Sequence, residues 1–237
     1  QTCALPIFWD VASGEKISKP LRHTSYMTDA RFSPDGSKVA TVSVTWGENA
    51  NSPWSVARGY VQVWDVATGN LICGPLRHED GNPDTLFIPD TFKLVTATID
   101  EAFFSTDGTR VFTAGGDRAV RVWDVATGEP VLGPFRHDDY IRRIFLTPDN
   151  SKIITSSRDG TVQIWDATRG KPLHDPIRSS GLSTLVALSP DGSKIATAGR
   201  DSSIRMWDTD TGFAVGAPLK HFGMNVNMGI NWSADGS

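Results

Sequence analysis

Cysteine is nearly absent from this chain of 237 residues, which has only Cys3 and Cys73. Cys3 lies in an N-terminal segment, residues 1–7, that does not fit the pattern of the rest of the chain. Cys73 is then left alone, which excludes an intrachain disulfide framework. A single Cys agrees with a reducing compartment such as the cytoplasm, without establishing one.

Long hydrophobic runs and an excess of one charge are absent as well. No stretch approaches the ~18 to 20 apolar residues of a membrane span. The formal net charge of −4 gives no drive toward nucleic acid, which usually requires a concentrated basic face. We therefore expect neither a membrane nor a nucleic-acid partner, and the ordinary share of charged residues (21%) fits a soluble domain.

The sequence also has no motif for catalysis or metal binding: GxSxG, HExxH, the P-loop and paired-Cys spacings are all missing. Residues 208–212 (Asp-Thr-Asp-Thr-Gly) are similar to the start of a calcium loop. The equivalent residues 124–128 and 166–170 lack the second carboxylate, so a polar turn is the better interpretation. The sequence predicts no metal and no cofactor.

What the chain does have is a repeat. Five Trp-Asp dipeptides occur, and the last three are spaced by 42 residues. A His follows four of the five Trp residues at a constant distance. A fixed period near forty, made of short β-type runs and turns, is typical of a repeat architecture. The Trp residues are Trp9, Trp64, Trp123, Trp165 and Trp207, and the His residues are His23, His78, His137 and His221.

One repeat, residues 138–178, contains four short β-prone runs at 141–146, 152–156, 161–165 and 171–178. Turn sequences rich in Pro, Asp, Asn and Gly separate these runs. The runs predict four antiparallel strands with no helical period. Because one such sheet cannot bury both of its faces, successive copies must stack.

The pattern resembles the WD-repeat β-propeller family, over nearly the whole chain from Phe8. The resemblance implies an all-β fold of four-stranded antiparallel blades. Four blades have every strand, and partial ones lie around Trp9 and at residues 226–232. Known rings of the family mostly have more blades, so we expect an incomplete or strained ring from a larger parent. The full blades are those of Trp64, Trp123, Trp165 and Trp207.

The resemblance also implies a buried hydrogen-bond chain of His, Ser or Thr, Asp and Trp in each blade. One blade matches every position, and a second matches if an insertion is allowed. Because a catalytic site occurs once whereas this set recurs, we interpret it as structural. The sets are His137, Thr155, Asp159 and Trp165; His78, Thr113, Asp117 and Trp123; Thr197, Asp201 and Trp207, with Ser179 in place of His; and His23, Thr41 and Trp64, with no Asp.

The two ends depart from the repeat. Residues 1–7 fit no part of it, and read back into codons they resemble a short-read sequencing adapter, so we exclude them as a scar. Residues 231–237 stop inside a repeat. We therefore expect residues 8–237 to be a WD-repeat fragment that is open at both ends.

Two insertions interrupt the frame. The first, residues 44–56, reads as a lengthened hairpin centred on residues 49–52, in which Trp46 and Trp54 face each other. The second arises because residues 87–97 resemble residues 104–114, so that the sequence of two strands is duplicated. Either copy could fill the blade, and we favour the second because it keeps the spacing to Asp117. Both insertions emerge on the same rim of a propeller.

We interpret the chain as a non-catalytic protein-interaction scaffold that presents loops on one face, with a protein or peptide as its partner. The aromatic and acidic insertions suit a basic partner, although neutral loop drift is the alternative. A second class is an enzyme with a central pocket, where Thr28, Arg142 and Thr184 are poor acid–base groups. A third is the sensory part of a longer signalling chain, such as a kinase fusion. The candidate partner-binding residues are Trp46, Trp54, Arg58, Glu79, Asp80, Asp84 and Asp90.

Overall fold

The structure is a computed structural model in which all regular elements of the described residues are β-strands. The chain divides into two compact units, residues 1–134 and 135–237. The predicted all-β fold of four-stranded antiparallel sheets is confirmed, and the expected incomplete or strained ring stays a prediction. The described residues are 8–9, 12–17, 21, 23, 26–45, 58–78, 86–88, 93–95, 99–178, 185–199, 201–220 and 230–234.

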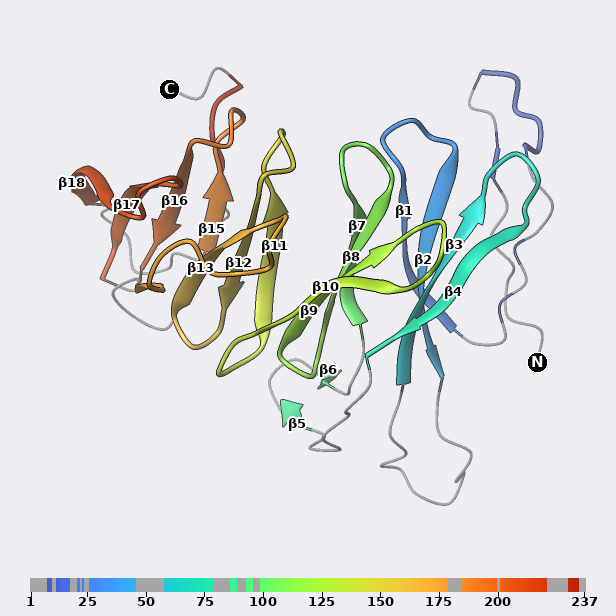
Figure 1. Ribbon diagram of the computed structural model, residues 1–237, viewed down its shortest axis with the longest axis horizontal. Helices are drawn as coiled ribbons and strands as arrows, with labels where there is room; N and C mark the ends of the chain where they lie inside the picture. The colour runs from blue at the N-terminus through green and yellow to red at the C-terminus, as the bar shows by residue number, and fades with distance from the viewer. Residues whose placement is uncertain are drawn as a thin grey trace. The chain divides into compact units, whose positions relative to one another are not determined.

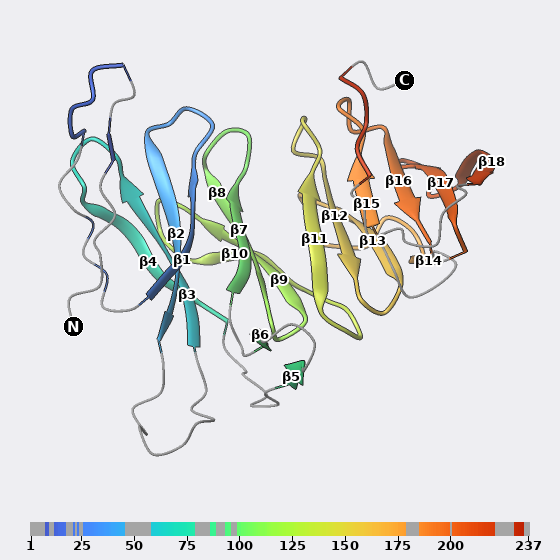
Figure 2. The same cartoon turned by 180° about the vertical axis from the view of Figure 1, so that it is seen from behind.

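The first unit contains two four-stranded sheets and one two-stranded sheet (Figures 1 and 2). The first sheet has the order β1-β2-β3-β4, and the second has the order β10-β9-β8-β7, with β10 crossing into the second unit. The strands are β1 (Tyr26–Phe32), β2 (Lys38–Thr45), β3 (Arg58–Asp65), β4 (Leu71–Arg77), β5 (Leu86–Ile88), β6 (Lys93–Val95), β7 (Ile99–Phe104), β8 (Arg110–Gly115), β9 (Ala119–Asp124) and β10 (Pro130–Arg136).

The second unit contains two further four-stranded sheets, each in sequential order. Each is therefore a meander, because every strand pairs with the next one along the chain. The strands are β11 (Ile141–Leu146), β12 (Lys152–Ser157), β13 (Thr161–Asp166), β14 (Ile177–Arg178), β15 (Leu185–Leu188), β16 (Lys194–Ala198), β17 (Ser203–Asp208) and β18 (Ala214–Lys220).

The second copy of the duplicated segment forms part of the four-stranded sheet, as the spacing predicts. That copy supplies β7 and β8 of the four-stranded sheet, paired from Ile99↔Gly115 to Phe104↔Val111. The first copy forms β5 and β6, which pair only with each other. The insertion is therefore a small hairpin in the connection between β4 and β7.

In four of the five Trp-Asp dipeptides, those of the described residues Asp65, Asp124, Asp166 and Asp208, the Asp organises the turn that follows it. Asp65 Oδ1 accepts hydrogen bonds from Thr68 N and Thr68 Oγ1, both at 2.7 Å. Asp124, Asp166 and Asp208 do the same in their own turns. These hydrogen bonds hold the pKa of the Asp65 carboxyl below its usual value. The dipeptide therefore sets both a core Trp and a turn.

One predicted strand is much shorter than expected. Residues 171–178 were predicted to be a full strand, whereas β14 contains only Ile177 and Arg178. Pro172 and Pro176 do not account for the loss, because Pro130 and Pro134 occupy the equivalent positions of β10, which keeps seven residues. A single bridge, Trp165↔Pro172, remains of the outer pairing.

The sheets of each unit pack face to face through aliphatic side chains. In the first unit Val61 and Val63 of β3 share a buried cluster with Val111 and Trp123. In the second unit Ile154 and Ile164 lie in one cluster with Ile195 of the next sheet. Each fully buried side chain of this size contributes ~1.5 to 3 kcal/mol, so these contacts between sheets stabilise each unit.

Candidate functional site

A Trp indole donates to a Thr hydroxyl in all four of the larger sheets. The pairing Ile153↔Trp165 sets Thr155, two residues further along β12, on the same face as the indole. The Nε1–Oγ1 distances are nearly identical in the four copies. They are 2.9 Å for Trp64–Thr41, 2.8 Å for Trp123–Thr113, 2.8 Å for Trp165–Thr155 and 2.9 Å for Trp207–Thr197.

The β7–β10 sheet has the complete chain. His78 Nε2 lies 2.8 Å from Thr113 Oγ1, and His78 Nδ1 lies 2.7 Å from Asp117 Oδ1. Arg121 adds a 2.6 Å bond to the second oxygen of Asp117. Burial raises the pKa of Asp117, but His78 and Arg121 outweigh it and hold this pKa below its usual value. A Cβ on Gly115 would lie 2.6 Å from His78 Nδ1, so this glycine makes room for the ring.

The β11–β14 sheet reaches its Asp through an additional residue. His137 Nε2 lies 2.7 Å from Thr155 Oγ1, but His137 Nδ1 is 3.6 Å from Asp159 Oδ2. Nδ1 instead lies 3.1 Å from the hydroxyl of Thr161, which donates to Asp159 Oδ1 at 2.5 Å. Thr161 was not among the residues predicted from the sequence. Its position two residues after Asp159, which Ser203 shares in the next repeat, is the signal that could have revealed it.

The other two sheets have partial chains. His23 Nδ1 contacts Ser43 Oγ at 3.0 Å rather than Thr41, and its ring packs on Trp64 with centroids 5.1 Å apart. In the β15–β18 sheet, Asp201 accepts hydrogen bonds from Ser203 and Arg205 within the described residues. Ser179, which stands where His was expected, lies outside them. These two sheets therefore hold their Trp by shorter networks.

The chemistry available to these His residues is restricted. Both ring nitrogens of His78 and of His137 have partners, and the two side chains are 1% and 3% exposed. Burial lowers the pKa of His137, with a smaller opposing effect of Asp159. With both nitrogens of each ring in contact with protein groups, neither His has a free position for a substrate proton.

The residues assigned to partner binding fall on two connections that leave one end of the β1–β4 sheet, except Arg58, which begins β3 at that end. The pairs Thr45↔Arg58 and Tyr60↔Arg77 set the end of β2, the start of β3 and the end of β4 side by side. The side chains of Trp46, Trp54, Arg58, Glu79, Asp80, Asp84 and Asp90 lie outside the described residues.

The calcium-like segment is a polar turn. Asp208 Oδ1 accepts hydrogen bonds from Asp210 N, Thr211 N and Thr211 Oγ1 at 2.8 to 3.1 Å. Within the described part of the chain, no group of three His, Cys, Asp or Glu residues is arranged to hold a metal ion. The same residues contain no helix long and apolar enough to cross a membrane.

Comparison with known proteins agrees with this geometry. The family model "WD domain, G-beta repeat" matches residues 91–124, 129–166 and 174–208. WD repeat-containing protein 1 of Gallus gallus is 27% identical over 112 residues, which cover 46% of this chain and 14% of that protein. The chain therefore contains WD repeats between residues 91 and 208, as the Trp-Asp frame predicts.

Proposed function

We propose that this chain is a non-catalytic scaffold that binds a protein or peptide through loops on a rigid β framework. Repeats of this family typically mediate protein–protein interactions. The observation that supports the proposal is that two long connections, residues 46–57 and 78–98, start from neighbouring strand ends at one end of the β1–β4 sheet. Long loops on compact domains are commonly functional.

The residues of these loops suggest the kind of partner. Trp46 and Trp54 would supply aromatic anchors, which provide most of the affinity in protein interfaces. Glu79, Asp80, Asp84 and Asp90 would add an acidic border that favours a basic partner and speeds its association. Because the two Trp residues share one hairpin connection, the proposal does not require them to face each other.

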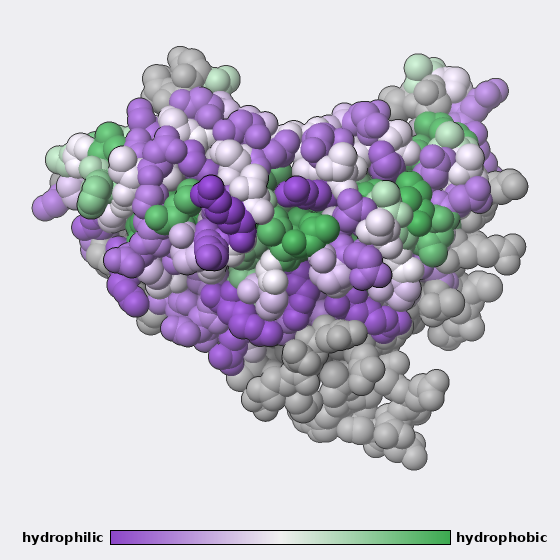
Figure 3. Space-filling model, viewed as in Figure 1, coloured by the Kyte–Doolittle hydropathy of each residue, from purple (hydrophilic) through white to green (hydrophobic). Residues whose placement is uncertain are grey.

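The remaining apolar surface is a weaker candidate. On the surface seen in Figure 3, hydrophobic residues form several separate patches among hydrophilic ones. Exposed apolar residues such as Leu71, Val131 and Leu173 lie on or beside outermost strands. Scattered residues of this kind are normal on a soluble protein and need no partner.

The test compares two double variants in capture of partners from lysate. Trp46→Ala with Trp54→Ala should abolish capture while the melting temperature stays within a few degrees of wild type. The control, Trp9→Ala with Phe213→Ala, removes two exposed aromatic side chains elsewhere and should leave capture intact. Equal loss in both variants, or retention in the first, would overturn the proposal. A collapse of the fold in the first variant would show that these Trp residues are core.

A further inference from the structure

Five exposed arginines gather at one end of the β11–β14 sheet, in the second unit (Figure 2 shows the sheet). The pair Ile141↔Ser157 and the bond from Arg158 N to Tyr140 O, 2.9 Å, bring the start of β11 to the β12–β13 turn. The pair Thr161↔Arg178 adds the end of β14. The bond from Asp138 N to Asp159 ties the end of β10 to the same turn. This arginine cluster comprises Arg136, Arg142, Arg143, Arg158 and Arg178.

A β-bulge sets two of these arginines side by side. The register of β11 shifts between Ile141 and Arg143, so Arg142 is the extra residue of the bulge. Bulges re-aim side chains and are common beside functional sites. Both Arg142 and Arg143 are exposed, although neighbouring residues of a regular strand point to opposite faces.

The bulge is part of the repeat, but its arginines are not. β1 and β7 have the same shift in register, at Thr28 and Asp100. The residues there are Thr28-Asp29 and Asp100-Glu101, with acidic side chains where β11 has Arg142-Arg143. A blade therefore folds with either sign of charge at this position. Folding therefore does not require the arginine pair at this bulge.

The charge of the cluster is not neutralised locally. Arg121 and Arg205 of the flanking repeats pair with the Asp of their own turns. Among the described residues, by contrast, the five arginines of the cluster have no carboxylate within ion-pair distance. Of the nearby carboxylates, Asp159 is occupied by Thr161 and Asp138 N, and Asp139 accepts from Tyr140 N. The region thus has five arginines and three carboxylates, those of Asp138, Asp139 and Asp159, which leaves an excess of positive charge.

We propose that the arginine cluster binds an acidic peptide segment of a protein partner. The inference rests on the proposed function as an interaction scaffold, and it places a second surface, of opposite charge, on another sheet. Guanidinium groups form bidentate hydrogen bonds with carboxylates, and an Arg-Arg pair offers two such forks together. A nucleic acid fits less well, because three carboxylates lie within the cluster and the chain has a net charge of −4.

The experiment measures fluorescence anisotropy of a labelled twelve-residue Glu/Asp peptide with the 237-residue chain. Its probe control is the matching Gln/Asn peptide, and a single-stranded oligonucleotide tests the polyanion alternative. Arg142→Asp with Arg143→Glu copies the residues that β7 carries at the same bulge, so the sheet should fold. We expect this variant to weaken binding of the acidic peptide by about tenfold or more.

The matched control is Arg169→Asp with Lys171→Glu, which makes the same change in net charge at the opposite end of this sheet. It should leave the affinity within about twofold of wild type, because surface charges act over about one Debye length. Equal loss in both variants, no binding of the acidic peptide by wild type, or tighter binding of the oligonucleotide would each overturn the inference. Capture of partners that depends on Trp46 and Trp54 would survive those outcomes, so the proposed function is tested separately.

Discussion

The β11–β14 and β15–β18 sheets have the same Trp–Thr hydrogen bond but very different burial. Ile177 of β14 is 5% exposed because it packs against Val186 and Ile195 of the next sheet, whereas Leu219, its equivalent in β18, is 56% exposed. Most of β13 is buried, whereas most of β17 is only half-buried. A repeat motif therefore determines the local bond, and the neighbouring sheet determines how much that bond stabilises.

The largest expected difference between the two sheets concerns the central Thr. Thr155→Val would leave both His137 Nε2 and Trp165 Nε1 without a partner in a buried site, at a cost of about 2 to 5 kcal/mol. Among the described residues, Thr197→Val would leave only the half-buried Trp207 Nε1 without a partner, at about 1 kcal/mol. Urea denaturation of the two variants measures both values. Equal losses would show that the extra His contributes nothing.

A second difference lies in the turns that precede β12 and β16. Asn150 and Gly192 both have positive φ, 58° and 75°, but a Cβ on Gly192 would lie 2.8 Å from Pro148 Cδ of the preceding sheet. Asn tolerates this backbone conformation, so Gly192→Asn tests the steric effect of the added side chain against Pro148 without backbone strain. We expect it to cost about 1 to 3 kcal/mol through overpacking. The reverse change, Asn150→Gly, should cost under about 1 kcal/mol.

Acid should weaken the β11–β14 sheet before its neighbour. Burial lowers the pKa of His137 below the ordinary 6.5, so below that pH the unfolded state takes up a proton that the folded state resists. Stability is therefore lost as the pH falls through 6.5 toward the lowered value. Hydrogen exchange of residues 152–166 and 194–208 at about pH 7.5 and about pH 5.5 measures the effect. His137→Gln should remove this loss of stability at low pH. An unchanged pH response in that variant would show that another group causes the loss.

The sequence predicted the sheets and the Trp–Thr bonds because both depend on local pattern. Trp and Thr lie on adjacent strands in a fixed register, so their spacing alone brings them together. The link from His137 to Asp159 through Thr161 was missed, because it depends on about 1 Å of ring placement that no spacing encodes. The late start of β14 at Ile177 was also missed, and Pro172 and Pro176 give no signal for it, because β10 has prolines at the equivalent positions and is a full strand. The arginine cluster was missed because its members come from four separate segments.

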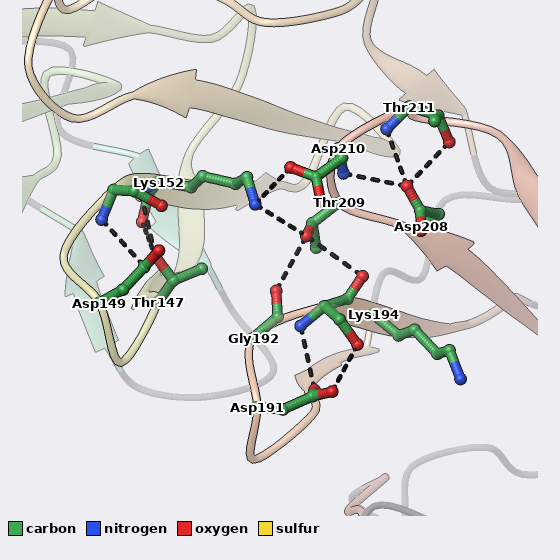
Figure 4. Close-up of polar contacts among 12 residues, drawn as sticks. Thr147, Asp149, Lys152, Asp191, Gly192, Lys194, Asp208, Thr209, Asp210 and Thr211 are labelled. Carbon is green, nitrogen blue, oxygen red and sulfur yellow. Dashed lines mark hydrogen bonds and ion pairs between the residues drawn. The ribbon is translucent and has the colours of Figure 1, made fainter.

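The smallest expected effect concerns an ion pair between the two sheets of the second unit. Lys152 Nζ lies 2.7 Å from Asp210 Oδ1 and 3.4 Å from Thr209 Oγ1 (Figure 4). Asp210 is 73% exposed at its side chain, so solvent screens the pair. Lys152→Met keeps the packing of the side-chain stem and should cost at most about 0.5 kcal/mol.

Lys194 is the matched control, because it occupies the same position in the next sheet and has no ion pair among the described residues (Figure 4). Lys194→Met should therefore change the free energy of unfolding by less than Lys152→Met does. The difference between the two variants should shrink in about 1 M salt, where the Debye length falls to about 3 Å. A difference that persists at high salt would show that Lys152 acts through its contact with Thr209, which is buried and bonded to Gly192 O at 2.8 Å, rather than through its charge.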